Sequence, residues 1–435
     1  MHELFERLIA DFHERPLPRL TRRDVRLPAL RGKVDAVVGM RRTGKTSLLL
    51  ARAAELHAAG VPREGVLYVN FDDERLLPLE ARELDALVET YYRLYPARRA
   101  ALSYLMLDEI QNVPGWERWI RRLLDTEAVQ VAVTGSSARL LGREIATSLR
   151  GRALTTEVYP FSFREALRHR GMEPARAPPY GGRTRSRLDR ALREHLAEGG
   201  FPEVQGLDPA LRVRVLQEYV DVAVLRDVAE RHRVSNLPAL RALVRQALAH
   251  PAGELSITRL HRELRSRGLA VSRDTLHEYF AYLEDAYLLS GVTLWTRSER
   301  ARRVNPRKVY PVDTGLALAH ARRLDPDWGR LLESWVFLEL RRRGYAIGYY
   351  RTRSSREVDF LAEHPAGGRR LVQAAWTLEG EGTRARALEA AAEAMRELRL
   401  REGEVVTWVE EETVEAGRGR RIRVVPAARW ALELD

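Results

Sequence analysis

The sequence predicts an α/β chain in which a parallel sheet flanked by helices is followed by a helical region and a second α/β domain. In the first part, short apolar runs rich in β-branched or aromatic residues alternate with helical patterns, which favours a parallel sheet. From residue 185 to 231 the patterns are helical with little strand signal, and beyond residue 331 strands and helices mix again. The strands expected in the first part are 34–38, 66–71, 104–107 and 129–134.

A chain of 435 residues is long enough for two to four domains, each with its own core. An amphipathic helix and a connector are expected at the start, and a Pro- and Gly-rich linker at 171–183. The expected divisions are a helix and connector (1–30), a first α/β domain (31–170), a linker and helical region (171–235), a compact helical module (236–312) and a second α/β domain (313–435).

Composition excludes several classes of protein. The chain has no cysteine, which rules out disulfide scaffolds, zinc-thiolate sites, iron–sulfur clusters and cysteine nucleophiles. No uncharged apolar run approaches the roughly 18 residues of a membrane span, and the start lacks the apolar stretch of a signal peptide. We therefore expect a cytoplasmic protein that does not contact a membrane.

Arginine has almost replaced lysine. Of 73 basic residues only Lys33, Lys45 and Lys308 are lysine, so 70 are arginine, and the net charge is +12. This bias indicates a GC-rich genome more than a function, and the four asparagines with no cysteine suggest a thermophile. The modest positive charge permits a nucleic acid partner without establishing one.

The strongest motif is GMRRTGKT at residues 39–46, which fits G-x-x-x-x-G-K-[ST] between an expected strand and an expected helix. Glycines let the backbone N–H groups point at phosphates, and the following helix adds partial positive charge. A chance glycine-rich turn would lack this strand–loop–helix context. The motif predicts a P-loop NTPase sheet that binds ATP through Gly39, Arg42, Thr43, Gly44, Lys45, Thr46 and Ser47.

Two residues of the motif have specific roles. Lys45 is expected to reach the β- and γ-phosphates, and Thr46 to hold Mg²⁺. A lysine retained in a chain that uses arginine elsewhere favours a place where a compact point charge is needed.

Two adjacent carboxylates end the expected strand 104–107. At this place in P-loop ATPases, Asp108 would hold Mg²⁺ through water and Glu109 would polarise the attacking water. Adjacent acids after a strand are also common in solvated loops. The strand 66–71 lies between them and the P-loop, as expected for the class with an additional strand and a catalytic glutamate.

Small polar residues follow the expected strand 129–134. Ser136 could touch the γ-phosphate or the lytic water, although capping a helix is an equally good role for it. Further on, Arg150 and Arg152 are candidates for an arginine finger that reaches the nucleotide of a neighbouring subunit. Only their position supports this role in a chain so rich in arginine.

Several longer segments carry a family resemblance. LDEIQNVPGWERWIRRLLD, VTGSSARLLGREIATSLRGRA and YPFSFREAL, with GGFPEV, YLEDAYLL, NPRKVYPVDTGL and REVDFL further on, resemble AAA+-type ATPases of archaea and bacteria that carry a C-terminal domain of unknown function. The resemblance covers roughly residues 30–430. It implies ATP and Mg²⁺ as cofactors and a homo-oligomer, for which a hexamer is one option.

Residues 256–287 have the pattern helix, turn, helix, in which Gly268 ends the first helix and Ser272 caps the second. A strand at 288–294 and a basic segment at 297–308 follow, which is the layout of a winged helix with a β-hairpin wing. Winged helices also pack against proteins, and a charged hairpin can be a solvated turn. The candidate DNA contacts are Arg273, His277, Arg297, Arg300, Arg302, Arg303 and Lys308.

The last domain is similar to PD-(D/E)xK nucleases. Glu333 on a helix precedes Glu357 and Asp359 at the start of a strand. On the next strand Gln373 stands where that layout has its second acid and Ala375 where it has its lysine, so the metal site is incomplete. We expect a restriction-endonuclease-like domain that is inactive as a nuclease. The alternative is that Glu357 and Asp359 simply belong to a solvated acidic loop.

The sequence therefore predicts a Mg²⁺-dependent AAA+-type ATP hydrolase that acts as an oligomeric motor or remodeller of branched or duplex DNA. The order of ATPase core and winged helix resembles that of branch-migration motors and replication initiators. One alternative is a slow nucleotide-operated switch whose winged helix contacts protein. Another is an active metal-dependent nuclease coupled to ATP.

Overall fold

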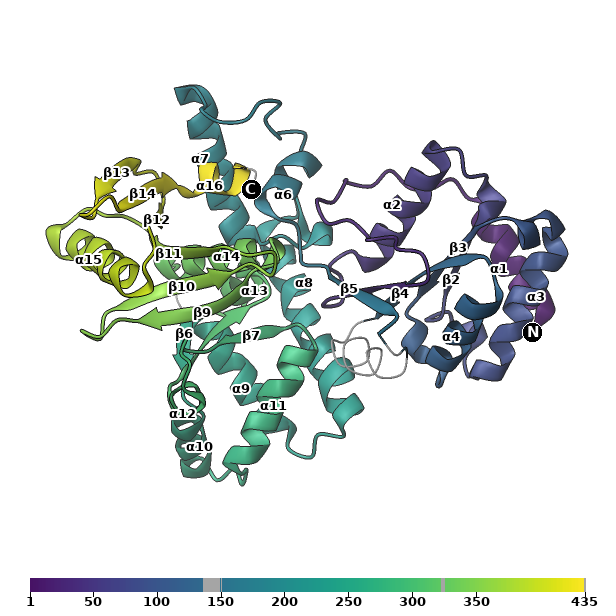
Figure 1. Cartoon of the computed structure of the whole chain (residues 1–435). Coiled ribbons are helices and arrows are strands. Elements are labelled where there is room, and N and C mark those ends of the chain that lie inside the picture. The colour runs from purple at the N-terminus through teal and green to yellow at the C-terminus, as the bar shows by residue number, and fades with distance from the viewer. Residues whose placement is uncertain (136–148, 150, 322–324, 434–435) are drawn as a thin grey trace. The chain divides into compact units, whose positions relative to one another are not determined.

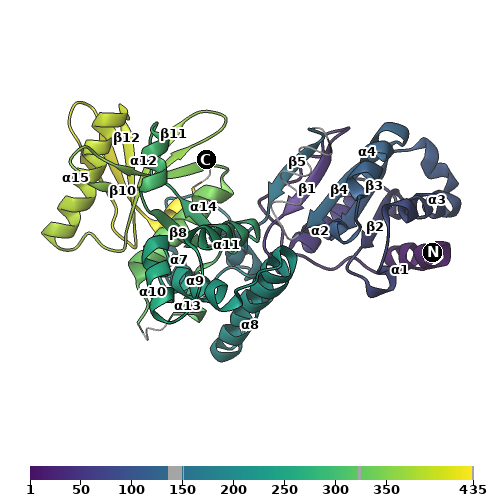
Figure 2. The same cartoon turned by 90° about the horizontal axis from the view of Figure 1, so that it is seen from below.

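The structure is a computed structural model of the whole chain and describes residues 1–135, 149, 151–321 and 325–433. It divides into two compact units, Met1–Tyr159 and Pro160–Asp435. Figures 1 and 2 show the elements of each unit. Across the described ranges, every helix is too short or too polar to cross a membrane.

A five-stranded parallel sheet forms the centre of the first unit, in the order β2-β3-β4-β1-β5. The apolar runs of the sequence become its strands because their side chains are buried beneath flanking helices. This arrangement confirms the predicted P-loop NTPase sheet. The strand that lies between β1 and β3 in the sheet is β4, however, and not the expected strand 66–71, which forms β2 at the edge. The strands are β1 (Val34–Val38), β2 (Val66–Asn70), β3 (Ser103–Asp108), β4 (Val129–Gly135) and β5 (Ala153–Glu157).

Helices cover this sheet. The N-terminal helix α1 packs against α3 and β2, and its Phe5 and Ile9 are fully buried. One core cluster joins Leu49 and Ala53 of α2 to Val37 of β1. The described α-helices of the unit are α1 (His2–Glu14), α2 (Lys45–Ala58), α3 (Leu84–Leu94) and α4 (Trp116–Thr126).

The second unit begins with helices, as its sequence pattern predicts. A π-helical segment, Ala223–Glu230, continues directly from α8. The α-helices before the first strand are α6 (Phe163–His169), α7 (Gly182–Glu198), α8 (Pro209–Val222) and α9 (Leu237–Ala249).

A small antiparallel sheet follows in the order β6-β8-β7; α9 packs on β8, α11 packs on β7, and α10 packs against α11. The predicted helix–turn–helix corresponds to α10 (Ile257–Ser266) and α11 (Arg273–Asp285). The strands are β6 (Gly253–Leu255), β7 (Leu289–Val292) and β8 (Arg307–Pro311). The prediction of a plain β-hairpin was wrong, because the basic segment between β7 and β8 contains the short helix α12 (Glu299–Val304), capped by Ser298.

A six-stranded mixed sheet ends the chain, in the order β13-β14-β12-β11-β10-β9. Helix α15 packs on it through a row of alanines and Met395. Its strands are β9 (Ala346–Arg351), β10 (Glu357–Glu363), β11 (Arg369–Ala375), β12 (Glu402–Thr407), β13 (Glu412–Glu415) and β14 (Arg421–Pro426). The remaining helices are α13 (Thr314–Ala319), α14 (Trp328–Arg342), α15 (Glu381–Leu398) and α16 (Ala427–Leu432).

Candidate functional site

The glycine-rich loop between β1 and α2 has backbone conformations that demand glycine. Gly39 has φ +148°, and a Cβ there would lie 2.2 Å from the carbonyl oxygen of Val158. Gly44 has φ +99° and immediately precedes the first turn of α2. A side chain at either position would be strained. The loop is therefore shaped by its glycines, as the motif predicts, and it turns into the N-terminus of α2.

Lys45 is buried inside this loop. Its Nζ donates to the carbonyl oxygens of Gly39 and Met40, both at 3.1 Å. The hydroxyl of Thr43 also donates to the oxygen of Met40, at 2.9 Å. The loop thus holds the ammonium of Lys45 close to the N-terminus of α2. Phosphate groups bound there would contact both the ammonium and the backbone N–H groups of the helix terminus.

The connector before β1 supports the loop from outside. Arg23 donates through one terminal nitrogen to the carbonyl oxygen of Thr43 at 2.9 Å, and through the other to that of Tyr159. One guanidinium therefore joins the loop to the segment after β5. Sequence reasoning missed this residue, because a single arginine among 70 gives no signal.

Asp108 ends β3 and is buried, with both carboxylate oxygens hydrogen-bonded. Tyr68 of β2 donates to Oδ2 at 2.9 Å, and Thr134 of β4 donates to Oδ1. Burial raises the pKa of Tyr68, and the Asp108 carboxylate raises it further, so the phenol remains a donor. Two neighbouring strands thus fix the orientation of this carboxylate.

Glu109 follows in a left-handed conformation, with φ +53°. Its N–H donates to Thr134 Oγ1 at 2.9 Å, and its carboxylate accepts from the side-chain amide of Gln111. A left-handed conformation is unusual for a residue other than glycine and concentrates at functional sites. Thr134 therefore holds both acids, and sequence reasoning had singled out Ser136 instead of it.

The sheet brings these groups to one edge. Because the strands are parallel, Val38, Gly135 and Asp108 end together at the carboxyl edge of β1, β4 and β3. The carboxyl edge is where parallel α/β sheets bind ligands. Sequence reasoning placed the loop and the acidic pair correctly at strand ends, and the sheet order makes them neighbours.

These residues fit a nucleotide and its cation. The curled loop around Lys45 leaves no room for a Cβ at Gly39, which suits close approach of backbone to phosphate. Thr46, exposed in the first turn of α2, and the fixed carboxylate of Asp108 offer the oxygen donors that Mg²⁺ prefers. The exposed Arg42 lies in the same loop with φ +67°.

Two predicted residues, Ser136 and Arg150, lie outside the residues that the structure describes. Arg152 immediately precedes β5, and its guanidinium forms an ion pair with Asp125 of α4. Lys33, for which the sequence suggested no role, donates to the carbonyl oxygen of Gly151 at 2.6 Å.

A second cluster of charged residues lies in the second unit and corrects two expectations. Lys308 is only 5% exposed. Its Nζ lies 2.5 Å from Glu333, 3.0 Å from Asp359 and 3.2 Å from Glu357. It is therefore not an exposed DNA contact, because its ammonium is committed to buried carboxylates. The nuclease-like acids do have a lysine beside them, which comes from β8 and not from the strand that carries Gln373.

Two neighbouring side chains also donate hydrogen bonds to the carboxylates of this cluster. The hydroxyl of Tyr310 donates to Glu333 at 2.8 Å, and the amide of Gln373 donates to Asp359. Burial raises the pKa of Glu333, as does the Asp359 carboxylate, while Lys308 acts in the opposite direction. The single ammonium offsets one unit of the negative charge of the three carboxylates and lies within 3.2 Å of each of them.

The other DNA-contact candidates lie on α11 and around α12. Arg273 and His277 are exposed on α11, Arg297 and Arg300 are exposed beside or on α12, and the side chain of Arg303 is outside the described part. Arg302 is exposed but forms an ion pair with Glu299 at 2.8 Å. The pKa of His277 is lowered, chiefly by desolvation.

The segment between β7 and β8 also contacts the large sheet. A parallel bridge joins Leu294 to Tyr349 of β9, and the N–H of Trp295 donates to the carbonyl oxygen of Tyr349 at 2.8 Å. The hydroxyl of Tyr349 donates back to the carbonyl oxygen of Pro306 at 3.0 Å. The expected wing is thus partly docked on β9 of its own unit.

Comparison with known proteins divides the chain into three matched segments. Residues 31–167 match an AAA domain, residues 189–327 a domain of unknown function (DUF8612), and residues 328–430 another domain of unknown function (DUF4143). The uncharacterized protein MJ1544 of Methanocaldococcus jannaschii is 31% identical over 99% of this chain and 95% of its own length. An uncharacterized protein of Haemophilus influenzae is 30% identical over 76% of this chain and 79% of its own length.

Among solved structures, the Walker-type ATPase PABY2304 of Pyrococcus abyssi is similar, with a TM-score of 0.42 and 15% identity. The similarity covers 74% of this chain and 95% of that chain. The AAA domain match and the five-stranded parallel sheet together show that the first unit has the fold of an AAA-type P-loop ATPase.

Proposed function

This chain belongs to the same family as the uncharacterized protein MJ1544 of Methanocaldococcus jannaschii, and we propose that it hydrolyses ATP with Mg²⁺ at the site in its first unit. One observation carries the proposal: Thr134 accepts from the N–H of Glu109 while its hydroxyl donates to Asp108, at the sheet edge where the loop of Lys45 begins. A site for nucleotide binding alone would not need a second, separately oriented acid.

In this proposal the loop between β1 and α2 and the N-terminus of α2 bind the phosphates. The backbone N–H groups after Gly39 and the side chain of Lys45 would bind the phosphate oxygens, with Thr43, Gly44 and Ser47 shaping the same turn. Thr46 and Asp108 would hold Mg²⁺, which supplies neutralisation of the phosphate charge when it is bound. Arg42, exposed on the loop, is positioned to contact the nucleotide from the solvent side.

Glu109 is the proposed general base. Its backbone is fixed by Thr134, and the amide of Gln111 keeps its carboxylate from rotating freely. A carboxylate oriented in this way can accept the proton of the attacking water and aim the oxygen at the γ-phosphate. Ser136, directly after β4, is proposed to contact the γ-phosphate or that water.

Completion of the site by a second copy is also part of the proposal. Arg150 and Arg152 follow β4 in sequence and would reach the nucleotide of a neighbouring subunit in a homo-oligomer. For Arg152 this requires release of its ion pair with Asp125, which is a surface pair of small energetic weight. In a single chain Arg152 would pair with Asp125, and in the oligomer it would contact the nucleotide of the neighbouring subunit.

We propose that residues 236–312 form a winged helix that binds DNA. The order α9-β6-α10-α11-β7-α12-β8 is that of the motif except for the short helix α12 within the wing, and α11 presents Arg273 and His277 to solvent as a recognition helix would. Arg297 and Arg300 would contact phosphates beside it, as would Arg302 and Arg303. Branched or duplex DNA is the proposed substrate of an ATP-driven motor or remodeller.

The second unit ends, in this proposal, in a restriction-endonuclease-like domain that does not cleave DNA. The order α14-β9-β10-β11-α15-β12 supports the fold assignment. The absence of cleavage is supported by Gln373 and Ala375, which stand where that layout has its second acid and its lysine. It is also supported by the ammonium of Lys308, which already lies within 3.2 Å of Glu333, Glu357 and Asp359.

A second candidate function is a slow nucleotide-operated switch whose winged helix contacts protein. The contact of Leu294 and Trp295 with β9 favours it, because this part of the wing already packs against protein. Such a switch would retain its nucleotide and turn over slowly, with no response to DNA.

Both candidates are tested by measuring ATPase rate and particle size together, with and without linear and four-way DNA. The motor predicts Mg²⁺-dependent turnover that DNA stimulates in an oligomer, with a response that weakens as salt rises. Turnover that is indifferent to every DNA, with nucleotide retained on each chain, would favour the switch. No hydrolysis under any of these conditions would contradict the ATPase proposal itself.

A further inference from the structure

Three tryptophans form a stack at the carboxyl edge of the six-stranded sheet. Trp376 follows β11 and Trp408 follows β12, with ring centroids 4.5 Å apart and ring planes inclined by 19°. Trp328, the first residue of α14, stacks on Trp376 at 5.4 Å and 30°. A hydrogen bond from the backbone N–H of Trp408 to the backbone carbonyl oxygen of Trp376 joins the two strand ends.

The stack is not a buried core feature. All three tryptophans are partly exposed, whereas Trp335 and Trp430 of the same unit are only 1% and 2% exposed. Trp408 ends the stack, since no second ring lies against it among residues 1–135, 149, 151–321 and 325–433. Partly exposed, parallel indole rings keep apolar surface in contact with water at a cost in stability, which indicates a surface that binds something flat.

Positive charge accompanies the stack. The guanidinium of Arg193, on α7, lies 4.8 Å from the ring centroid of Trp328. The first twelve residues of α7 contain a single acid, Asp189. Their five arginines are Arg183, Arg185, Arg187, Arg190 and Arg193, of which Arg185 and Arg190 form ion pairs with Glu411 and Glu194. A basic helix thus runs beside the stacked rings.

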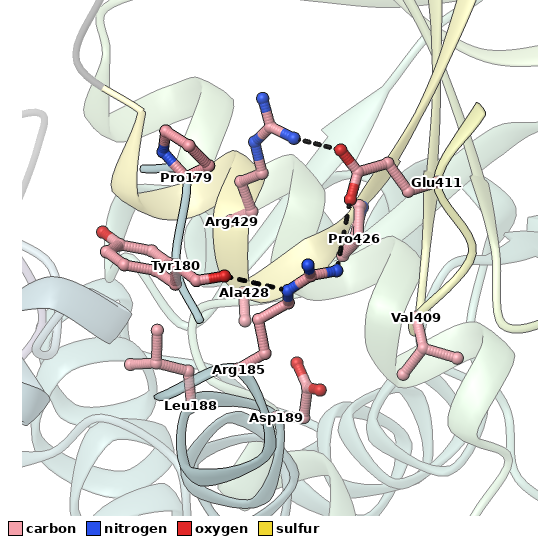
Figure 3. Close-up of a pocket in the computed structure, with 10 residues that line it drawn as sticks. All are labelled: Pro179, Tyr180, Arg185, Leu188, Asp189, Val409, Glu411, Pro426, Ala428 and Arg429. Carbon is pink, nitrogen blue, oxygen red and sulfur yellow. Dashed lines mark hydrogen bonds and ion pairs between the residues drawn. The ribbon is translucent and has the colours of Figure 1, made fainter. Parts of the chain in front are cut away.

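Figure 3 shows a pocket that the same helix lines through Arg185, Leu188 and Asp189. Val409, the residue after Trp408, forms part of its wall and is 51% exposed, and Leu188 of α7 forms another part. Asp189 also lines it, one helical turn before Arg193, and burial raises the pKa of its carboxyl. At the rim, Arg185 lies between the carbonyl oxygen of Tyr180 and the carboxylate of Glu411, as Figure 3 shows.

We propose that this surface, made of the three stacked tryptophans, the pocket of Figure 3 and the arginines of α7, binds single-stranded nucleic acid. A base would stack on the outer face of Trp408, and a neighbouring base would enter the pocket beside Val409. Arginines of α7 would meet the phosphates. Stacking surfaces combined with a basic track are the general means by which proteins bind single strands, and every base can stack.

The chemistry favours a single strand over other partners. Bases of a duplex are stacked on one another and cannot lie flat on Trp408 without unpairing. The carboxylate of Asp189 and the guanidinium of Arg185 offer an acceptor and donors for the edge of an unpaired base. A sugar chain also lies flat on indole rings, but it would gain nothing from five arginines. The inference concerns residues separate from the nucleotide site and from α11, so it does not depend on ATP hydrolysis.

The test is binding of a fluorescently labelled oligothymidylate to the full chain without nucleotide, by anisotropy and by quenching of tryptophan fluorescence. Trp408→Ala should weaken binding about tenfold, the loss expected for one base–aromatic stack, and should reduce the quenching. Trp408→Phe should retain most of the affinity. Arg193→Gln should weaken binding less and should lower its salt dependence, whereas Arg396→Gln, an exposed arginine on α15, should change neither.

Two results would overturn the proposal. One is no binding of the oligonucleotide at low salt, which would leave sugars or peptides as occupants of the surface. The other is unchanged affinity in both Trp408→Phe and Trp408→Ala, with melting temperatures showing that both variants fold. A failure here leaves the ATPase proposal untouched, because no ATP is present in the assay.

Discussion

The ammonium of Lys308 lies 2.5 Å from Oε1 of Glu333, although one residue comes from the small sheet and the other from helix α14. The pair is buried, and Glu357 and Asp359 complete it. This contact joins β8 to the large sheet and gives a surviving lysine a structural role. Because its members come from β8, α14 and β10, this cluster of charges cannot be recognised from a short sequence motif.

Removal of this lysine should be costly. Lys308→Met leaves carboxylates buried without their cation, which is expected to destabilise the second unit by about 3–5 kcal/mol. Urea denaturation of the full chain, followed by tryptophan fluorescence, would show the transition of the second unit at lower urea. Lys33→Met is the matched control, because Lys33 is exposed and makes one hydrogen bond to a carbonyl oxygen. Equal midpoints for Lys308→Met and the wild type would contradict the role of the cluster.

Thr134 should matter to catalysis although it is not expected to touch the nucleotide. Thr134→Val keeps the size of the side chain and removes the hydroxyl that contacts Asp108 and Glu109. We expect the ATPase kcat to fall about 10- to 100-fold, as for loss of a residue that orients a metal ligand. Thr134→Ser should retain much of the activity. If Thr134→Val hydrolysed ATP at the wild-type rate, the two acids would not depend on this hydroxyl.

The exposed arginines near α12 give a salt signature if the winged helix binds duplex DNA. The double variant Arg297→Gln and Arg300→Gln removes two proposed phosphate contacts. The slope of log Kd against log salt should fall by about 2, with affinity reduced for all sequences alike. Arg386→Gln with Arg396→Gln, two exposed arginines on α15, is the control. An unchanged slope in the first variant would leave the wing as a protein contact.

Buried His195 predicts how the second unit responds to acid. Burial, with smaller contributions from the charges of Arg342 and Arg170, lowers its pKa to about 3. The unfolded chain binds this proton below about pH 6.5 and the folded chain does not, so stability is present above that pH and is lost as pH falls toward 3. His195→Phe should show a smaller drop in melting temperature between neutral pH and pH 4.5. Parallel melting curves for variant and wild type across this range would refute the assignment.

The strands that the sequence predicted correctly are those that are buried on both faces. All five residues of β1 are buried and four of them are apolar, with Asp35 the exception, and the pattern alone located it. The strand β5 was missed because its sequence ALTTE is mostly polar, and it lies at the edge of the sheet with one buried residue. A half-exposed edge strand carries no apolar run to recognise.

Site residues divide in the same way. The positions of Lys45 and Asp108 were predictable because the loop of Lys45 follows β1 and Asp108 is the last residue of β3, so local sequence specifies where each lies. Lys308 was placed wrongly because its partners come from α14 and β10, and no local pattern encodes that contact. Tyr68 was missed for the same reason, since it reaches Asp108 across neighbouring strands.

The measurement that tests the central claim most directly is Mg²⁺-dependent ATP binding and turnover by the wild type, Lys45→Ala and Glu109→Gln, with Lys33→Ala as control. Wild type and Lys33→Ala should bind and hydrolyse ATP. Lys45→Ala should lose both binding and hydrolysis. Glu109→Gln should bind ATP but hydrolyse it at least about 100-fold more slowly, because a general base typically contributes about 100- to 10,000-fold to the rate. Hydrolysis at the wild-type rate by Lys45→Ala or by Glu109→Gln would contradict the account.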